Sequence, residues 1–316
     1  MSGGRRSVDD SVVPRGQTVL ITGGAGFVGS HLAEALVDHN DVRILDDFSA
    51  GKRGNLPTDV TVIEGDVRDS TVVDEAMSGV DIVFHEAAMV SVSKSVEQPL
   101  RSHAVTGDGS LLVLDHARRE DARVVLASSA AVYGHPESVP IHESAGKRPT
   151  SPYGIDKLTA DQYARRFSDL YGLETVVLRY FNIYGPRQNP EYSAVVRTFF
   201  DRATEGEDIA IEGDGTQTRD FVHVDDVVQA NCRAATTDRV GEAFNIGTGS
   251  SVTVRGLAEA IRRVTDSDSE VVHVDPRPGD IDDSRADITR AREGLDYEPT
   301  VSLSEGLDSL VGELTV

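Results

Sequence analysis

The pattern of hydrophobic and polar residues predicts short buried strands that alternate with amphipathic helices. The apolar run 19–22 is followed by a glycine-rich turn and by an amphipathic helix over 27–37. Further strands are expected at 42–45, 60–63, 81–84, 123–128 and 174–179, and longer helices at 91–119, interrupted near Pro99, and at 152–171. This alternation is typical of an α/β fold with a Rossmann-type, doubly wound parallel sheet.

The pattern changes after residue 185. Turn-rich stretches at 185–186 and 213–215 alternate with shorter helices near 194–204, 224–235 and 254–264, and with strands near 243–246 and 271–274. We therefore expect a dinucleotide-binding domain over 18–184. Residues 185–316 are expected to form a smaller substrate-binding lobe with segments that return to the sheet. The polar residues 1–17 contain no apolar run, and we interpret them as a flexible extension rather than a signal peptide.

The glycine-rich turn after the first strand predicts a dinucleotide site. Gly23 permits a tight turn, Gly26 lets backbone approach a pyrophosphate, and Gly29 lets the following helix lie close to the strand. That helix begins at Phe27 and Val28, so its free N–H groups and positive dipole end face the phosphates. A glycine triplet by itself is a weak signal, and here the strand before it and the helix after it supply the required context.

Asp46 follows the second predicted strand and stands 20 positions beyond Gly26. A carboxylate at this place suits the ribose diol of a dinucleotide, which favours NAD as the cofactor. No arginine directly follows Asp46, which argues against a 2′-phosphate, although Lys52 and Arg53 leave NADP open. The alternative interpretation of Asp46 is a solvated loop acid.

The composition excludes several classes of partner. The chain of 316 residues carries 53 acids against 31 bases, for a net charge of −22, and this sign argues against nucleic acid. No apolar stretch approaches the roughly 20 residues that cross a bilayer. An acid excess with only four lysines is the composition of a salt-adapted cytoplasmic protein. The single cysteine, Cys232, excludes an internal disulfide, and no spacing of ligands predicts a metal site.

Tyr153 and Lys157 stand one helical turn apart at the start of the predicted helix 152–171. A tyrosine with a pKa of about 10 is a poor base, and a nearby ammonium favours its phenolate; a pKa of about 7 requires roughly 4 kcal/mol of differential interaction. Ser129 ends the strand before them and is placed to hydrogen-bond the same substrate hydroxyl. The spacing also arises by chance on surface helices, but the dinucleotide turn and the strand-end serine favour a catalytic trio.

Over residues 17–299 the chain resembles the extended short-chain dehydrogenase/reductases, and among them the nucleotide-sugar 4-epimerases. The stretches that carry the resemblance are TGGAGFVGSHL, EGDVRD, SSAAVYG, SPYGIDK, LRYFNIYGPRQ, GDGTQTRDFVHVDD, FNIGTG and RPGDIDDSRAD. Two positions depart from the family pattern. Ala104 stands where the family often has asparagine, and Glu86 stands where an apolar residue is usual.

The resemblance assigns roles to further residues. It implies that Asp66 and Val67 flank the adenine, that Ala87 and Ala88 lie along the cofactor, and that Tyr180 borders the nicotinamide. For the substrate it implies contacts with the nucleoside diphosphate and the sugar, from Ser91, Asn182, Arg219, Arg277, Asp280 and Ser284. A small residue at 284 leaves room for an acetamido group, so both UDP-glucose and UDP-N-acetylglucosamine are expected to react.

The function implied is NAD-dependent 4-epimerisation of a UDP-hexose through a 4-keto intermediate, with tightly held NAD. Dehydratases and decarboxylases of the family carry an acidic pair or a glutamate directly after the strand-end hydroxyl residue, where this chain has Ala130 and Ala131. An NAD(P)-linked reductase and a non-catalytic dinucleotide-binding module remain as alternatives. The related enzymes also pair two helices into a homodimer, which the apolar residues of 91–119 and 152–171, among them Leu114 and Tyr163, would permit.

Overall fold

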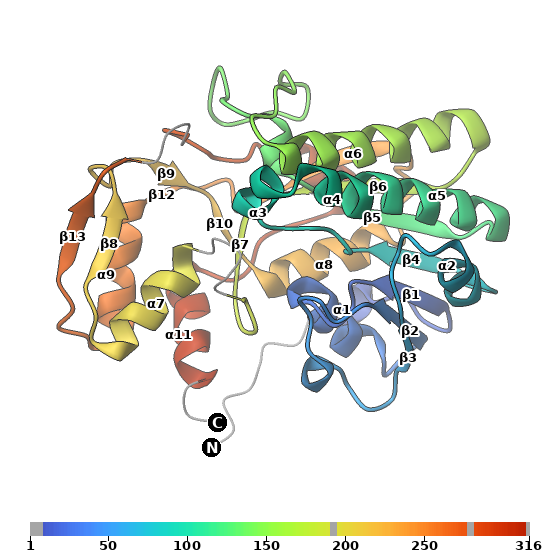
Figure 1. Ribbon diagram of the computed structural model, residues 1–316, viewed down its shortest axis with the longest axis horizontal. Coiled ribbons are helices and arrows are strands. Elements are labelled where there is room, and N and C mark those ends of the chain that lie inside the picture. The colour runs from blue at the N-terminus through green and yellow to red at the C-terminus, as the bar shows by residue number, and fades with distance from the viewer. Residues whose placement is uncertain (1–8, 190–194, 277–280, 314–316) are drawn as a thin grey trace.

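A seven-stranded sheet forms the centre of the computed structural model, which describes residues 9–189, 195–276 and 281–313 (Figure 1). Every pairing in the sheet is parallel, and the strand order is β11-β6-β5-β4-β1-β2-β3. The strands are β1 (Thr18–Thr22), β2 (Asp41–Asp46), β3 (Thr61–Glu64), β4 (Ile82–His85), β5 (Arg123–Ser129), β6 (Thr175–Tyr180) and β11 (Glu242–Ile246). The order reverses between β1 and β4, which is where a doubly wound sheet opens a crevice at the carboxyl ends of its strands.

Helices cover both faces of this sheet, so its strands are apolar on both sides. One face packs against α1 (Phe27–Leu36) and α8 (Val224–Ala234), and the other packs against α2 (Ser70–Met77), α5 (Gly109–Glu120) and α6 (Pro152–Tyr171). Neighbouring residues of one strand enter opposite layers: Val176 and Leu178 face the first layer, and Val177 faces the second. The predicted Rossmann-type sheet is therefore confirmed.

The helical stretch expected at 91–119 is interrupted at Pro99 as predicted, and it contains a further irregularity, a π-helical turn, that was not expected. It is divided into α3 (Val92–Glu97), α4 (Pro99–His103), a π-helical turn (Ala104–Asp108) and α5. Gln98 has φ −130° and ψ 60°, which ends α3, and Pro99 begins the next helix because it has no N–H to donate to the preceding turn.

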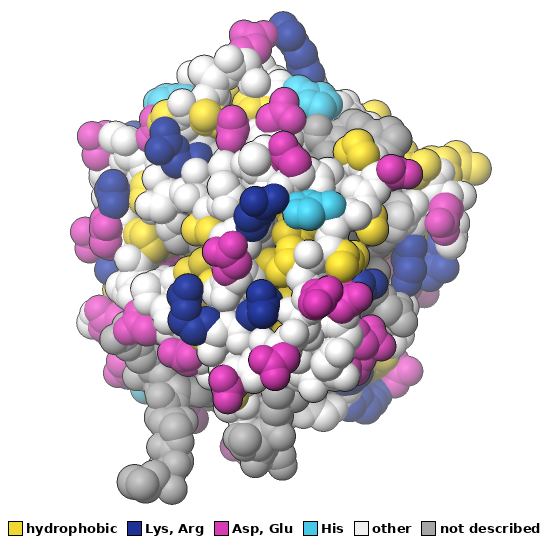
Figure 2. All heavy atoms as spheres, turned by 90° about the vertical axis from the view of Figure 1, so that its left-hand side faces the viewer, with side chains coloured by type: hydrophobic (Ala, Val, Ile, Leu, Met, Phe, Trp, Pro, Cys, Tyr) yellow, Lys and Arg dark blue, Asp and Glu magenta, His cyan; other side chains and the backbone are white. Residues whose placement is uncertain are grey.

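A smaller lobe lies on the left of Figure 1. Two parallel strands, β8 (Ile209–Glu212) and β13 (Val271–Val274), pack with α7 (Val195–Glu205), α9 (Val254–Val264) and α11 (Leu303–Glu313) around a separate apolar core. On the face seen in Figure 2, side chains of Asp and Glu are interspersed with those of Lys and Arg. The lobe is joined to the sheet through β7 (Asn182–Tyr184), which pairs with β10 (Phe221–His223). Strands β9 (Thr218–Arg219) and β12 (Val252–Thr253) form a short antiparallel pair, and helix α10 (Thr289–Leu295) packs in the same core as β11.

Residues 9–17, expected to belong to a flexible extension, are packed against the sheet domain. Val13 is buried in the core on the α1 side, and the backbone N–H of Gly16 donates to His39 O at 2.9 Å. Arg15 forms an ion pair with Asp10, the first residue of a short 3-10 helix (Asp10–Val12). The contacted residues, such as His39 just after α1, are distant from 9–17 in the sequence. The local sequence of 9–17 therefore does not reveal these contacts.

Candidate active site

A cleft of about 1840 Å³ lies at the carboxyl ends of the central strands, between the sheet domain and the smaller lobe. All of the residues predicted to bind the cofactor or to act in catalysis line this one cleft: Gly23, Gly26, Phe27, Val28, Gly29, Asp46, Asp66, Val67, Ala87, Ala88, Ser129, Tyr153, Lys157 and Tyr180. They come from seven different parts of the chain, and the parallel topology brings them together because equivalent strand ends share one edge of the sheet.

The glycine turn has the geometry that a dinucleotide pyrophosphate requires. Gly23 has φ +67°, and a Cβ there would lie 2.8 Å from the backbone of Ala87. A Cβ on Gly29 would overlap the carbonyl oxygen of Gly23. Only glycine at position 29 therefore allows α1 to lie this close to the turn. Helix α1 begins at Phe27 with no side-chain cap, which leaves its first N–H groups to a ligand in the cleft. The turn therefore fits a dinucleotide on steric grounds as well as by pattern.

Asp46 ends β2 beside this turn and is only 7% exposed. Its Oδ2 accepts a hydrogen bond from the N–H of Ala25 at 2.9 Å, and its Oδ1 accepts one from the N–H of Phe48 at 2.8 Å. Burial raises the pKa of Asp46 in spite of these two bonds. Asp46 is therefore not a solvated loop acid: it braces the glycine turn while lining the cleft.

Tyr153 and Lys157 are held at the cleft by the start of α6. Ser151 caps the helix by accepting from the N–H of Gly154 at 3.2 Å, and the N–H of Tyr153 donates to Ser95 Oγ of α3 at 3.1 Å. A Cβ on Gly154 would lie 2.8 Å from Ala131 O, so glycine allows the loop after β5 to lie against the helix. This close approach brings Ser129 within hydrogen-bonding reach of Tyr153.

The electrostatics of the trio differ from the sequence-based expectation. Burial raises the pKa of Tyr153, and the hydrogen bond with Ser129 only partly opposes it. Lys157, which was expected to lower this pKa, donates from Nζ to Ala127 O at 2.7 Å, and burial lowers its own pKa. A cationic ligand bound beside Tyr153 would favour the phenolate and so act against the effect of burial.

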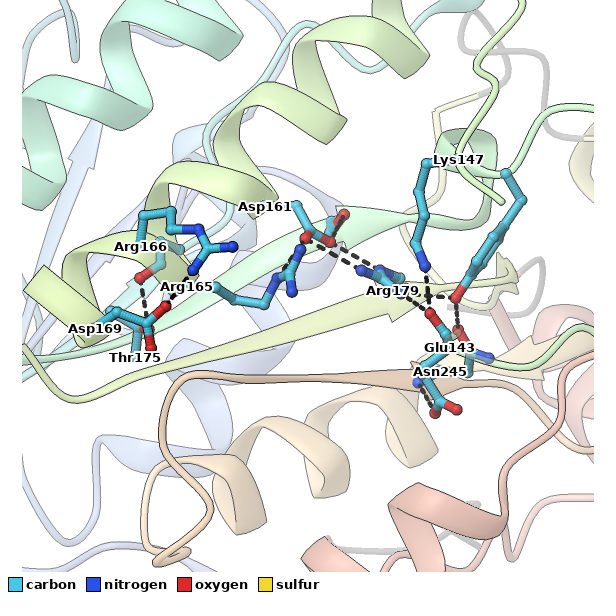
Figure 3. Close-up of polar contacts among 12 residues, drawn as sticks. Glu143, Lys147, Asp161, Arg165, Arg166, Asp169, Thr175, Arg179 and Asn245 are labelled. Carbon is cyan, nitrogen blue, oxygen red and sulfur yellow. Dashed lines mark hydrogen bonds and ion pairs between the residues drawn. The ribbon is translucent and has the colours of Figure 1, made fainter. Parts of the chain in front are cut away.

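A buried polar network fixes α6 against the sheet one helical turn beyond Lys157 (Figure 3). Arg179 of β6 donates to Asp161, one turn after Lys157 on α6, with Nε to Oδ2 at 2.8 Å. Arg179 Nη1 also donates to Tyr133 Oη at 2.9 Å, and Tyr133 donates in turn to Asn245 Oδ1 of β11 at 2.6 Å. The network therefore connects α6, the loop after β5, β6 and β11, which are the elements that position Ser129, Tyr153 and Lys157.

The predicted substrate residues form a second group. Asn182, Arg219 and Ser284 lie on neighbouring segments: the N–H of Asn182 donates to Asp220 O at 3.0 Å, and the N–H of Ser284 donates to Thr218 O at 3.1 Å. None of these three is among the described residues that line the cleft. Arg277 and Asp280 lie outside the described residues.

Ser91 is separate from this group. It is fully buried, and its hydroxyl caps α3 by accepting from the N–H of Lys94 at 3.2 Å. Like the three residues above, it is not among the described residues that line the cleft. The structure thus brings the predicted cofactor and catalytic residues into one cleft, and only part of the predicted substrate set into one neighbourhood.

Asp220 is the organising residue of the second group, and sequence reasoning missed it. It is fully buried, and its carboxylate accepts from the N–H groups of Thr248 (2.8 Å), Gly249 (3.1 Å) and Ala286 (3.0 Å). It thereby ties its own segment, beside Arg219, to two loops, at 248–249 and at 286. Its position next to Arg219 in the stretch TRDFVHVDD was the available signal.

The described residues contain no cluster of three or more His, Cys, Asp or Glu side chains that would hold a metal ion. None of the helices in the described part of the chain is both long and apolar enough to pass through a membrane.

Known proteins share this fold and sequence over nearly the whole chain. The family model described as "NAD dependent epimerase/dehydratase family" matches residues 19–247. A UDP-glucose 4-epimerase of Mycolicibacterium smegmatis is 37% identical, with 92% of this chain and 96% of that protein covered. A UDP-N-acetyl-alpha-D-glucosaminuronate decarboxylase of Bacillus cytotoxicus is 33% identical, with 92% and 96% covered.

Two solved structures of similar proteins superpose closely. The UDP-glucose 4-epimerase of Thermotoga maritima with UDP-glucose has a TM-score of 0.91 and 39% identity, and the match covers 94% of this chain and 98% of that one. The UDP-N-acetylglucosamine 4-epimerase of Methanobrevibacter ruminantium in complex with UDP-N-acetylmuramic acid has a TM-score of 0.90 and 36% identity, with 95% and 100% covered.

Proposed function

This chain belongs to the NAD-dependent epimerase/dehydratase family, and we propose that within it the chain is a 4-epimerase of UDP-hexoses. The observation that carries the proposal is the loop after β5. Ser129 lies within hydrogen-bonding reach of Tyr153, and the next two residues, Ala130 and Ala131, have side chains that cannot transfer a proton. The trio therefore supports chemistry at one hydroxyl without a second acid–base pair at the neighbouring carbons.

The proposed role of each residue follows from its surroundings. Gly23, Gly26 and Asp46 would hold NAD, which would supply hydride exchange with the sugar C4, with removal from one face and return to the other. Tyr153 takes the proton of the sugar 4-hydroxyl and later gives it back, and Ser129 donates to the same oxygen and orients it. Lys157, one helical turn from Tyr153 and held by Ala127 O, contributes a positive charge to the same end of the cleft.

The similar proteins include enzymes named for other reactions, among them a decarboxylase. Elimination from a 4-keto sugar needs an acid and a base at C5 and C6. In this chain the corresponding loop positions carry methyl side chains, and both are partly exposed on the short 3-10 helix Ala130–Val132 that follows Ser129. This absence of proton-transfer groups at the two loop positions supports epimerisation over dehydration or decarboxylation.

The substrate proposed is UDP-glucose, together with UDP-N-acetylglucosamine. Similar proteins are named for each of these activities, and the small residue Ser284 is compatible with both sugars. The test is to incubate the protein in turn with UDP-glucose, UDP-N-acetylglucosamine and UDP-glucuronate and to resolve the products by NMR. We expect the 4-epimers of the first two sugars with no net formation of NADH.

The controls separate the alternatives. Tyr153→Phe should give no product with any of the three sugars. A decarboxylated pentose from UDP-glucuronate, or a 4-keto-6-deoxy sugar from UDP-glucose, would identify a decarboxylase or a dehydratase instead. Stoichiometric NADH would identify a simple oxidoreductase.

A further inference from the structure

Glu86 is an acidic residue at the catalytic end of the cleft that has no role in the proposed chemistry. It directly follows β4, and its backbone N–H donates to Thr22 O of β1 at 3.1 Å, so its position is fixed at the edge of the sheet. Its side chain lines the cleft beside Tyr153, Lys157 and Tyr180 and is neither fully buried nor fully exposed. Burial disfavours the charged form of a carboxylate, so the presence of a glutamate at this place requires an explanation.

A directed chain of hydrogen bonds orients this carboxylate. Asn231 of α8 is fully buried and donates from Nδ2 to Tyr180 Oη at 2.8 Å and to Val227 O at 2.8 Å. The single hydroxyl proton of Tyr180 then points to Glu86 Oε1 at 2.9 Å, since a carboxylate accepts more strongly than the amide oxygen of Asn231 at 3.2 Å. Glu86 is therefore an acceptor held in one orientation by two residues behind it.

The charged and titratable groups around Glu86 do not satisfy it as an ion pair. From α6, Lys157 and Tyr153 face it, and from β6, Tyr180 faces it. Lys157 stabilises its charge from a distance, but Lys157 Nζ donates to Ala127 O. Burial raises the pKa of Glu86, and the charge of Lys157 opposes this.

We propose that Glu86 is a ligand-recognition residue, whose carboxylate accepts a hydrogen bond from an N–H or O–H donor that a bound ligand presents at the catalytic end of the cleft. Tyr180 donates to one oxygen of the carboxylate, Oε1, and Glu86 is among the residues that line the cleft. Two ligands carry suitable donors: the carboxamide of the dinucleotide and the hydroxyl or acetamido groups of the sugar. The first source rests on the NAD dependence of the family, and the second rests on the proposed function.

The test compares whole and truncated ligands by calorimetry. NAD and ADP-ribose, which lacks the nicotinamide, are titrated into protein freed of nucleotide, and UDP-glucose and UDP are titrated into the NAD-loaded protein. Glu86→Leu should weaken the binding of one intact ligand, NAD or UDP-glucose, by about 10- to 100-fold, because a charge-assisted hydrogen bond is lost. The truncated form of that ligand, ADP-ribose or UDP, should bind the variant with an affinity within about twofold of that for wild type. A loss confined to NAD identifies the carboxamide as the donor, and a loss confined to UDP-glucose identifies the sugar.

Two further variants make the result decisive. Glu86→Gln keeps the length of the side chain and an acceptor oxygen but loses the charge, so its affinity for the same ligand should fall by only a few-fold. If Glu86→Leu does not fold, the test rests on Glu86→Gln. Glu259→Leu removes one charge from an exposed site on α9 and should change nothing. Wild-type affinity for both whole ligands, or equal losses for whole and truncated ligands, would overturn the proposal. The experiment measures binding and not turnover. If the protein epimerises no sugar, the comparison of NAD with ADP-ribose still tests the role of Glu86.

Discussion

Arg179 and Asp161 form an ion pair that is almost completely sealed from water. Their exposed fractions are 1% and 0%, and the guanidinium meets the carboxylate through two hydrogen bonds, at 2.8 Å and 3.2 Å. The pair joins β6 to α6 one helical turn beyond Lys157, so the catalytic helix is anchored from behind by a contact that no ligand reaches (Figure 3).

Breaking this pair from one side should strongly destabilise the protein. Asp161→Ala leaves the Arg179 guanidinium buried without its carboxylate, which costs about 3–5 kcal/mol of unfolding free energy. The double variant Asp161→Leu/Arg179→Met removes both charges and should recover a large part of the loss. Chemical denaturation of the double variant and of its two single variants, Asp161→Leu and Arg179→Met, measures this. A double variant as unstable as the sum of the single variants would show that the network, and not the pair, is the stabilising unit.

Tyr153→Phe should reduce turnover by about 10² to 10⁴-fold, because it removes the group that accepts the proton and leaves the helix unchanged. Bound NAD, measured by absorbance of the purified protein, should be retained. The matched control is Tyr163→Phe on the same helix, where the ring is 42% exposed and only the hydroxyl is lost. A Tyr153→Phe variant within threefold of wild type would refute the catalytic assignment.

Asp46→Ala should lower the affinity of the protein for NAD and reduce its preference for NAD over NADP. It removes the carboxylate that lines the cleft, and it also leaves the N–H groups of Ala25 and Phe48 without their acceptor. We therefore expect a lower unfolding temperature for the protein without nucleotide as well. Asp47→Ala serves as the control, because Asp47 lines the same cleft but is exposed. Unchanged affinity for both nucleotides in Asp46→Ala would limit Asp46 to its structural role.

Ser284→Tyr should suppress reaction of UDP-N-acetylglucosamine selectively, since overpacking a site typically costs about 1–3 kcal/mol. Ser284 is 6% exposed, so the larger ring has to displace its neighbours. The measurement is kcat/KM for both sugars, with the unfolding temperature recorded alongside. An equal loss for UDP-glucose would show that the substitution disturbs the loops around Asp220 and that residue 284 does not select the sugar.

Apolar side chains left exposed on α3, α4 and α6 support the proposed homodimer. Val96 is 62% exposed, Leu100 86% and Leu170 69%, whereas Leu114, named from the sequence, is buried against the sheet. Leu100→Glu should therefore shift the protein toward monomer in light scattering at micromolar concentration. Val274→Glu, at a 47% exposed residue of β13, is the control and should leave the assembly unchanged. A wild-type protein that is already monomeric would refute the dimer.

The sequence by itself determined the features that depend on residues close together in the chain. The strand, glycine turn and helix over 18–36 follow from local periodicity and from the conformational freedom of glycine. The spacing of Tyr153 and Lys157 follows from the helical repeat. The gathering of the predicted cofactor and catalytic residues in one cleft also followed, because parallel strands all present their carboxyl ends at one edge.

The tertiary structure alone decided the features that join distant segments. Glu86 meets Tyr180 across 94 positions, and Arg123, expected only as the start of a strand, contacts Ala235 O across 112 positions. Asp220 gathers loops 28 and 66 positions away, and the raised pKa of Tyr153 reflects how deeply the folded chain buries it. Such contacts depend on which side chains the fold removes from water, and burial is a property of the assembled layers rather than of any local stretch of sequence.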